Sequence, residues 1–191
     1  MSDMNTSPSA GLDAEELLHL AIAASDRDQP ERAIELLKRA IAANPADARA
    51  HHLLGAEHAQ LGLFERAAEE MQRAIELDPE LDAARFQLGL LQLSSRQPQS
   101  AEATWRALER LGDGHFYVLF KNGLLHLARD EFANAARCLR AGLEANRTLE
   151  PLNRDMQGML AQVEALQAEH GGGDADGPGG HLFLDAYKRQ H

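Results

Sequence analysis

Histidine is the residue type whose number and spacing in this chain most invite a chemical interpretation, namely metal binding. There are nine histidines, with His51 and His52 adjacent and His58 seven residues after His51. Metal ligands on one helix normally lie three or four residues apart, because that spacing points their side chains to one face. The spacing here does not gather a ligand set. We therefore expect surface or partly buried histidines and no metal site.

Other side-chain chemistry is equally sparse. Cys138 is the only cysteine and lies among apolar residues, so we expect it to act as a small core hydrophobe. Acidic pairs such as Glu15–Glu16 are adjacent in sequence and do not converge on a helix. The glycine-rich stretch 171–180 follows no expected strand and contains no lysine, so it is not a phosphate-binding loop. The sequence thus predicts no catalytic residues, no cofactor and no enzymatic activity.

Composition limits the partners. Nineteen Lys and Arg residues stand against 30 Asp and Glu, which gives a formal net charge of −11. An acidic chain repels phosphate backbones and anionic lipids, so we expect neither nucleic acid nor a membrane as a partner. The first residues lack the features of a secretory signal, no run of about 18 apolar residues occurs, and a single cysteine suits a reducing compartment. These features favour the cytoplasm.

The elements that must position any site come from an internal repeat of 34 residues. Aligned on this period, the chain divides into units 14–47, 48–81, 82–115 and 116–149. The eighth position is always small: Ala21, Gly55, Gly89 and Gly123. The twentieth is always alanine, and the twenty-fourth is always large and apolar: Leu37, Met71, Trp105 and Leu139. Small residues let two helices of one unit approach closely, and we expect the large residue to fill the space between units.

The pattern resembles the tetratricopeptide repeat family. The second unit carries the resemblance best, with Leu53, Leu54, Gly55, Ala67, Met71, Ala74 and Pro79 in the family's positions. The resemblance implies an all-α fold in which four helix-turn-helix repeats form a right-handed superhelix. Second helices are expected to begin at Pro30 and Pro98, since proline is tolerated in a first helical turn, and at Phe64 and Phe132 in the other two units.

The ends of the chain differ from the repeats. Residues 1–13 are expected to be disordered, although Asp13 can cap the first helix. Residues 150–169 have helical apolar spacing and are predicted to form a helix that caps the array. Residues 170–180 form a glycine-rich linker, followed by the tail 181–191. The tail contains an apolar cluster: Leu182, Phe183, Leu184 and Tyr187.

In the family, the first helix of each repeat lines the concave face, broadly at positions 2, 5, 9 and 12. The resemblance therefore implies a peptide-binding groove, for which we select Leu18, Ile22, His52, Phe86, Leu90, Leu93, Tyr117, Phe120, Leu124 and Leu127. Apolar residues beyond one packing stripe would form an exposed patch, which usually marks a binding site. The alternative is that the first helices of the third and fourth units are buried all round, by the capping helix or by self-association.

The function expected is a non-catalytic interaction module, an adaptor or chaperone that binds an apolar peptide or helix of a protein partner in its concave groove. The Lys and Asn that clamp carboxylates in some family members are absent, and the apolar groove looks more like that of the family's small secretion chaperones. One alternative is a self-associating assembly factor, a possible homodimer whose tail docks in its own or a neighbour's groove. Another is an accessory subunit that positions a partner enzyme.

Overall fold

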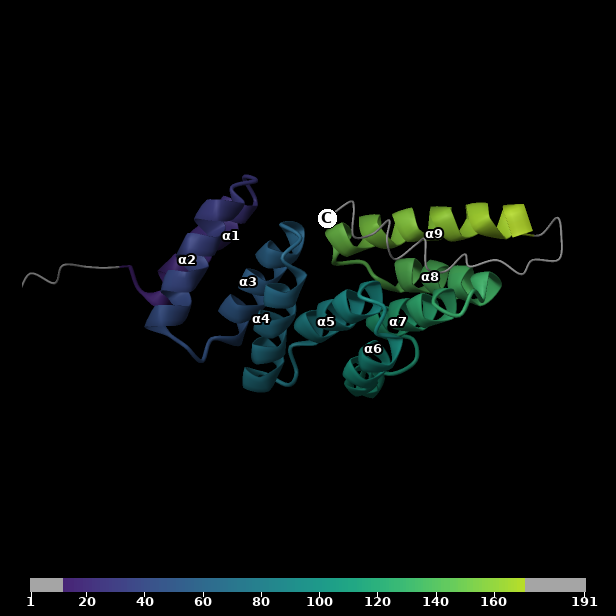
Figure 1. The fold of residues 1–191 in the computed structure, drawn as a ribbon, viewed down its shortest axis with the longest axis horizontal. Coiled ribbons are helices and arrows are strands. Elements are labelled where there is room, and N and C mark those ends of the chain that lie inside the picture. The colour runs from purple at the N-terminus through teal and green to yellow at the C-terminus, as the bar shows by residue number, and fades with distance from the viewer. Residues whose placement is uncertain (1–11, 171–191) are drawn as a thin grey trace, which may run out of the picture.

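The computed structural model describes residues 12–170, with side chains to residue 168. This part of the chain contains nine α-helices, one 3-10 helix and no strand (Figure 1). The α-helices are α1 Ala14–Ser25, α2 Pro30–Ala43, α3 Ala48–Gln60, α4 Phe64–Leu77, α5 Asp82–Ser94, α6 Pro98–Trp105, α7 Phe116–Leu127, α8 Phe132–Ala145 and α9 Glu150–His170. The all-α fold predicted from the sequence is confirmed. The tail and most of the linker lie outside the described residues.

Consecutive helices pack as antiparallel pairs, and the pairs follow one another along an elongated array (Figure 1). The pairs are α1 with α2, α3 with α4, α5 with α6 and α7 with α8, and their first helices begin 34 residues apart. Asp13 forms a capping box with Glu16 at the start of α1, so the predicted cap is confirmed, and Asp13 itself belongs to the ordered array. The four second helices begin at the predicted proline and phenylalanine positions.

Contact within a pair depends on the small residue at the eighth repeat position. A methyl group added to Gly55 would lie 2.9 Å from Cγ of Met71, and one added to Gly89 would lie 2.1 Å from Nε1 of Trp105. The close approach predicted for these glycines is therefore confirmed. The large residue at position 24 differs from expectation, because it packs on the glycine of its own repeat rather than only between repeats.

The turn between the two helices of each pair has one residue with positive φ, always at the fifteenth repeat position. These residues are Asp28, Gly62, Arg96 and Asp130, with φ values of 57°, 73°, 60° and 58°. A left-handed residue ends the first helix and reverses the chain. Four different sequences adopt the same turn, which keeps the geometry of the pairs alike along the array.

The third repeat and the last helix depart from the regular pattern. The second helix of the third repeat, α6, is only eight residues long and continues directly as the 3-10 helix η1, Arg106–Leu111. Helix α9 packs on α8 and contributes Met156, Met159 and Val163 to the core of the third and fourth repeats. The start of α9 points back toward α3, so that it faces the second and third repeats (Figure 1).

Candidate functional site

Most residues of the predicted groove are interior. Seven of the ten are buried in one core: Phe86, Leu90, Leu93, Tyr117, Phe120, Leu124 and Leu127. Leu18 is 2 % exposed in a separate core formed by the first repeat and α3, whereas Ile22 is 39 % exposed on α1 and His52 is half-buried. The apolar stripe that we expected to be exposed on α5 and α7 is thus covered. This agrees with the alternative that the first helices of the third and fourth repeats are buried all round.

The cover has a simple physical cause, which is aromatic packing within the third repeat and between the third and fourth repeats. The ring centroids of Phe86 and Tyr117 lie 5.1 Å apart, and those of Phe86 and Trp105 lie 5.8 Å apart. Such contacts bury large apolar areas and favour tilted or offset rings. Burial, with a smaller contribution from the carboxylate of Asp82, raises the pKa of the Tyr117 phenol to about 12. These side chains hold the third and fourth repeats together.

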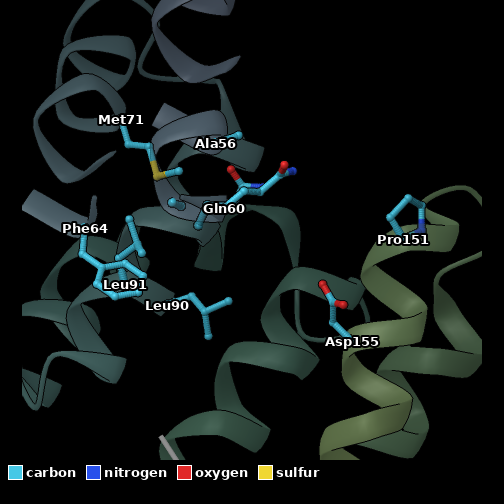
Figure 2. A pocket seen from close by; sticks show the side chains of 10 residues that line it. Ala56, Gln60, Phe64, Met71, Leu90, Leu91, Pro151 and Asp155 are labelled. Atoms are coloured by element: carbon cyan, nitrogen blue, oxygen red, sulfur yellow. The ribbon is translucent and has the colours of Figure 1, made fainter. Parts of the chain in front are cut away.

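An open apolar hollow lies beside this core, between α3, α5 and the start of α9 (Figure 2). We call it the concave hollow. It has a volume of about 220 Å³ and is lined by Ala56, Ala59, Gln60, Phe64, Met71, Gln87, Leu90, Leu91, Pro151 and Asp155. Ala56, Ala59 and Leu90 occupy repeat positions 9 or 12, which the family resemblance assigns to the concave face. Leu90 is the only predicted groove residue that lines the concave hollow.

Polar groups surround the apolar floor of the concave hollow. Gln60 and Gln87 come from α3 and α5, and the carboxylate of Asp155 faces the opening from α9 (Figure 2). The Oε1 atom of Gln87 lies 2.9 Å from Nε2 of His52 and accepts its hydrogen bond when that nitrogen carries the proton. Burial lowers the pKa of His52, and the hydrogen bond to Gln87 opposes this only in part. The predicted residue His52 therefore supports the wall of the concave hollow as a neutral ring.

A second, smaller hollow of about 190 Å³ adjoins the first and shares Phe64 and Leu91 with it. It lies between the start of α4 and the end of α5, and its remaining lining is largely polar: Glu65, Ala68, Gln92, Ser95 and Gln97. Phe64 and Leu91 thus form a wall between the two hollows. Of the two hollows, the concave hollow therefore has the more apolar lining.

Two histidines pair with carboxylates away from the two hollows. His51 Nδ1 lies 2.6 Å from the Glu70 carboxylate, and His126 Nδ1 lies 2.5 Å from that of Glu131. The bond to His126 lowers the pKa of Glu131. Within residues 12–170, no group of three His, Cys, Asp or Glu side chains is placed to hold a metal ion. No helix among those residues is long and apolar enough to cross a bilayer.

Sequence reasoning missed most of the residues that line the concave hollow. Ala56 and Ala59 stood at concave positions, and two small side chains next to the larger Leu90 were a signal of open space. Pro151 and Asp155 gave no such signal, because their contribution depends on where the start of α9 lies relative to α3 and α5. The tail residues Leu182, Phe183, Leu184 and Tyr187 lie outside the described residues.

Paired helices that recur at a fixed period and present one hollow surface define an α-solenoid of the protein-interaction class. The chain belongs to the tetratricopeptide repeat family, whose model matches residues 18–82 and 120–172. The resemblance inferred from the sequence is thereby confirmed.

Solved structures show the same fold. The crystal structure of MamA is 25% identical over 69% of this chain and 77% of that one, with a TM-score of 0.59. TTC0263, a thermophilic repeat protein of Thermus thermophilus, is 19% identical over 92% and 89%, with a TM-score of 0.67. YrrB, described as having an unusual peptide-binding site, is 17% identical over 91% and 84%, with a TM-score of 0.58. Among curated proteins, no match was found.

Proposed function

We propose that this protein is a non-catalytic adaptor or chaperone that binds an apolar segment of another protein in the concave hollow. The observation that carries the proposal is the open apolar floor made by Ala56, Ala59 and Leu90 on the face where this family is expected to bind. Binding sites of this kind combine an apolar floor with a few polar groups that orient the ligand. Gln60, Gln87 and Asp155 are placed for the second role.

Size indicates how the partner binds. An apolar cavity of about 150 Å³ holds a benzene-sized molecule, and the concave hollow has about 220 Å³. It therefore suits one large apolar side chain, or a ring and part of a neighbour, rather than a whole peptide. A helix or extended segment with one Phe, Leu or Trp anchor fits this description, and the rest of the segment lies across the polar rim.

Display of random peptides against the full chain tests this proposal. We expect enrichment of sequences with a single large apolar anchor. The substitution Ala59→Arg places a long charged side chain across the concave hollow and should weaken the selected peptides at least tenfold, about 1.4 kcal/mol. The matched control, Ala103→Arg, changes an exposed alanine on α6 and should leave binding unchanged. Equal loss with both variants, or no loss with either, would refute the proposed site.

A further inference from the structure

The C-terminal tail has the composition of a ligand for the concave hollow. Leu182, Phe183, Leu184 and Tyr187 are apolar, and Lys188 and Arg189 follow them directly. An apolar cluster of this kind is exposed to water unless a surface covers it. The concave hollow is a surface of matching character within the same molecule.

Shape and charge both suit this segment. The ring of Phe183 is of the size that a cavity of about 220 Å³ accepts, with room for part of a leucine. The rim carries the carboxylate of Asp155 facing the opening (Figure 2). With Asp185, Lys188 and Arg189, residues 181–191 carry a formal charge of +1, which is opposite in sign to Asp155 and to the chain as a whole.

The tail is long enough to reach the concave hollow of its own molecule. Helix α9 has 21 residues and is therefore about 30 Å long. The concave hollow lies near its start, at Pro151 and Asp155, and the tail leaves its other end at His170. A glycine-rich segment of the twelve residues that lead from His170 to Leu182 has a contour length of up to about 40 Å, and glycine-rich sequences of this length have an average end-to-end distance of about 19 Å. A return over about 20–30 Å is within this range, and such a linker supplies a millimolar effective concentration.

We propose that the tail docks in its own molecule's concave hollow, with Phe183 and Leu184 as the anchors, and must be displaced before a partner binds. The inference rests on the proposed function, because it assigns a competing ligand to the same site. Docking in cis lowers the apparent affinity for outside peptides by a factor that is set by the ratio of the tail's effective concentration to its own dissociation constant. The tail thereby sets the threshold that a true partner has to exceed.

A labelled peptide of residues 181–191, titrated against full-length variants by fluorescence anisotropy, tests this proposal. The variant Phe183→Ser/Leu184→Ser removes the anchors and opens the site. His181→Ser/Gln190→Ser is its matched control, with two serines placed outside the apolar cluster. We expect the peptide to bind the opened variant at least tenfold more tightly than it binds the wild type or the control. Adding Ala59→Arg to the opened variant should abolish this binding, and adding Ala103→Arg should not.

Three results would overturn the inference. Equal affinity for the wild type and the opened variant would mean that the tail does not occupy the site. Undiminished binding after Ala59→Arg would place the peptide elsewhere. A wild-type dimer that becomes a monomer on Phe183→Ser/Leu184→Ser, measured by light scattering, would assign the tail to a second copy.

The two proposals fail in different ways. If displayed peptides bind the opened variant and lose binding on Ala59→Arg, but the tail peptide does not bind, only the tail inference fails. If the tail peptide behaves as expected but no outside peptide can be selected against the opened variant, the proposed function fails and the tail inference stands.

Discussion

The glycine at the eighth position of the third repeat gives the sharpest test of the packing. Gly89 on α5 faces Trp105, and a methyl group there would lie 2.1 Å from Nε1 and 2.3 Å from Cε2 of the indole. Trp105 is fully buried, and its Nε1 donates a hydrogen bond of 3.0 Å to the carbonyl oxygen of Phe86. Gly89→Ala therefore cannot be accommodated unless the indole moves and this hydrogen bond breaks.

Three contributions determine how much Gly89→Ala changes the free energy of unfolding. Overpacking a core by one methyl group costs about 1–3 kcal/mol. Loss of the buried hydrogen bond from Trp105 costs about 1 kcal/mol more. Alanine is favoured over glycine in a helix by about 1 kcal/mol, which offsets the second term. We expect Gly89→Ala to lower the free energy of unfolding by about 2 kcal/mol.

Urea denaturation followed by circular dichroism measures this change. Gly123→Ala, at the same repeat position, is the matched control, because its new methyl group would lie 3.0 Å from Cγ of Leu139 and 3.3 Å from the carbonyl oxygen of Ala135, so that a shift of a few tenths of an ångström accommodates it. We expect the control to remain within about 0.5 kcal/mol of the wild type, since the helix preference of alanine compensates a small shift. A Gly89→Ala protein as stable as the control would refute the reasoning.

The first repeat suggests a second substitution that should compensate for Gly89→Ala. It carries the pair Ala21 and Leu37 at the positions of Gly89 and Trp105, and both are buried. In a Trp105→Leu background, Gly89→Ala should therefore cost little or nothing, so that the two substitutions are strongly non-additive. Additive losses in the double variant would show that the contact between these two residues is not the cause.

Further predictions concern two glycines, one histidine and the cysteine. Gly62→Ala should destabilise the fold by about 1 kcal/mol, because Gly62 has a φ of 73° and the added methyl group meets backbone strain but no neighbouring atom. Gly158→Ala inside α9 should stabilise the fold by about 1 kcal/mol, because alanine favours a helix. Urea denaturation distinguishes the two signs. Burial lowers the pKa of His58, so the unfolded chain binds a proton more readily and stability falls as pH drops below the ordinary histidine pKa of about 6.5. His58→Leu should reduce this slope, by at most about 1.4 kcal/mol per pH unit, in denaturation curves at pH 7.5 and pH 5.5. Burial also raises the pKa of Cys138, so iodoacetamide should modify it more slowly than a free thiol at neutral pH and reach the ordinary rate in urea.

The sequence predicted the repeat but not the surface that it creates. Its 34-residue period located the helix pairs, and the glycines at the eighth position identified the contacts within them. The exposure of the stripe containing Phe86 and Phe120 was wrongly predicted, because periodicity defines the faces of a helix but not the angle at which the next repeat covers them. The shared left-handed turn could not be predicted from the glycines, because Gly62 is the only glycine among its four residues.

The concave hollow depends on α9, which the sequence could describe only as an amphipathic helix. Its apolar residues predicted that it would cover the end of the array, and Met156 and Val163 do so. Its start, with Pro151 and Asp155, also lines one side of the concave hollow, and that placement follows from the packing of α9 on α8. A site made by distant segments in this way leaves little trace in local sequence.

The central claim is that an apolar ligand binds between α3, α5 and the start of α9. Amide chemical-shift mapping by NMR, on the isotope-labelled full chain titrated with a displayed peptide, tests it most directly. We predict that the largest shifts fall on Ala56, Ala59, Leu90 and Asp155. Shifts concentrated instead on α1, around the exposed residue Ile22, would contradict the claim.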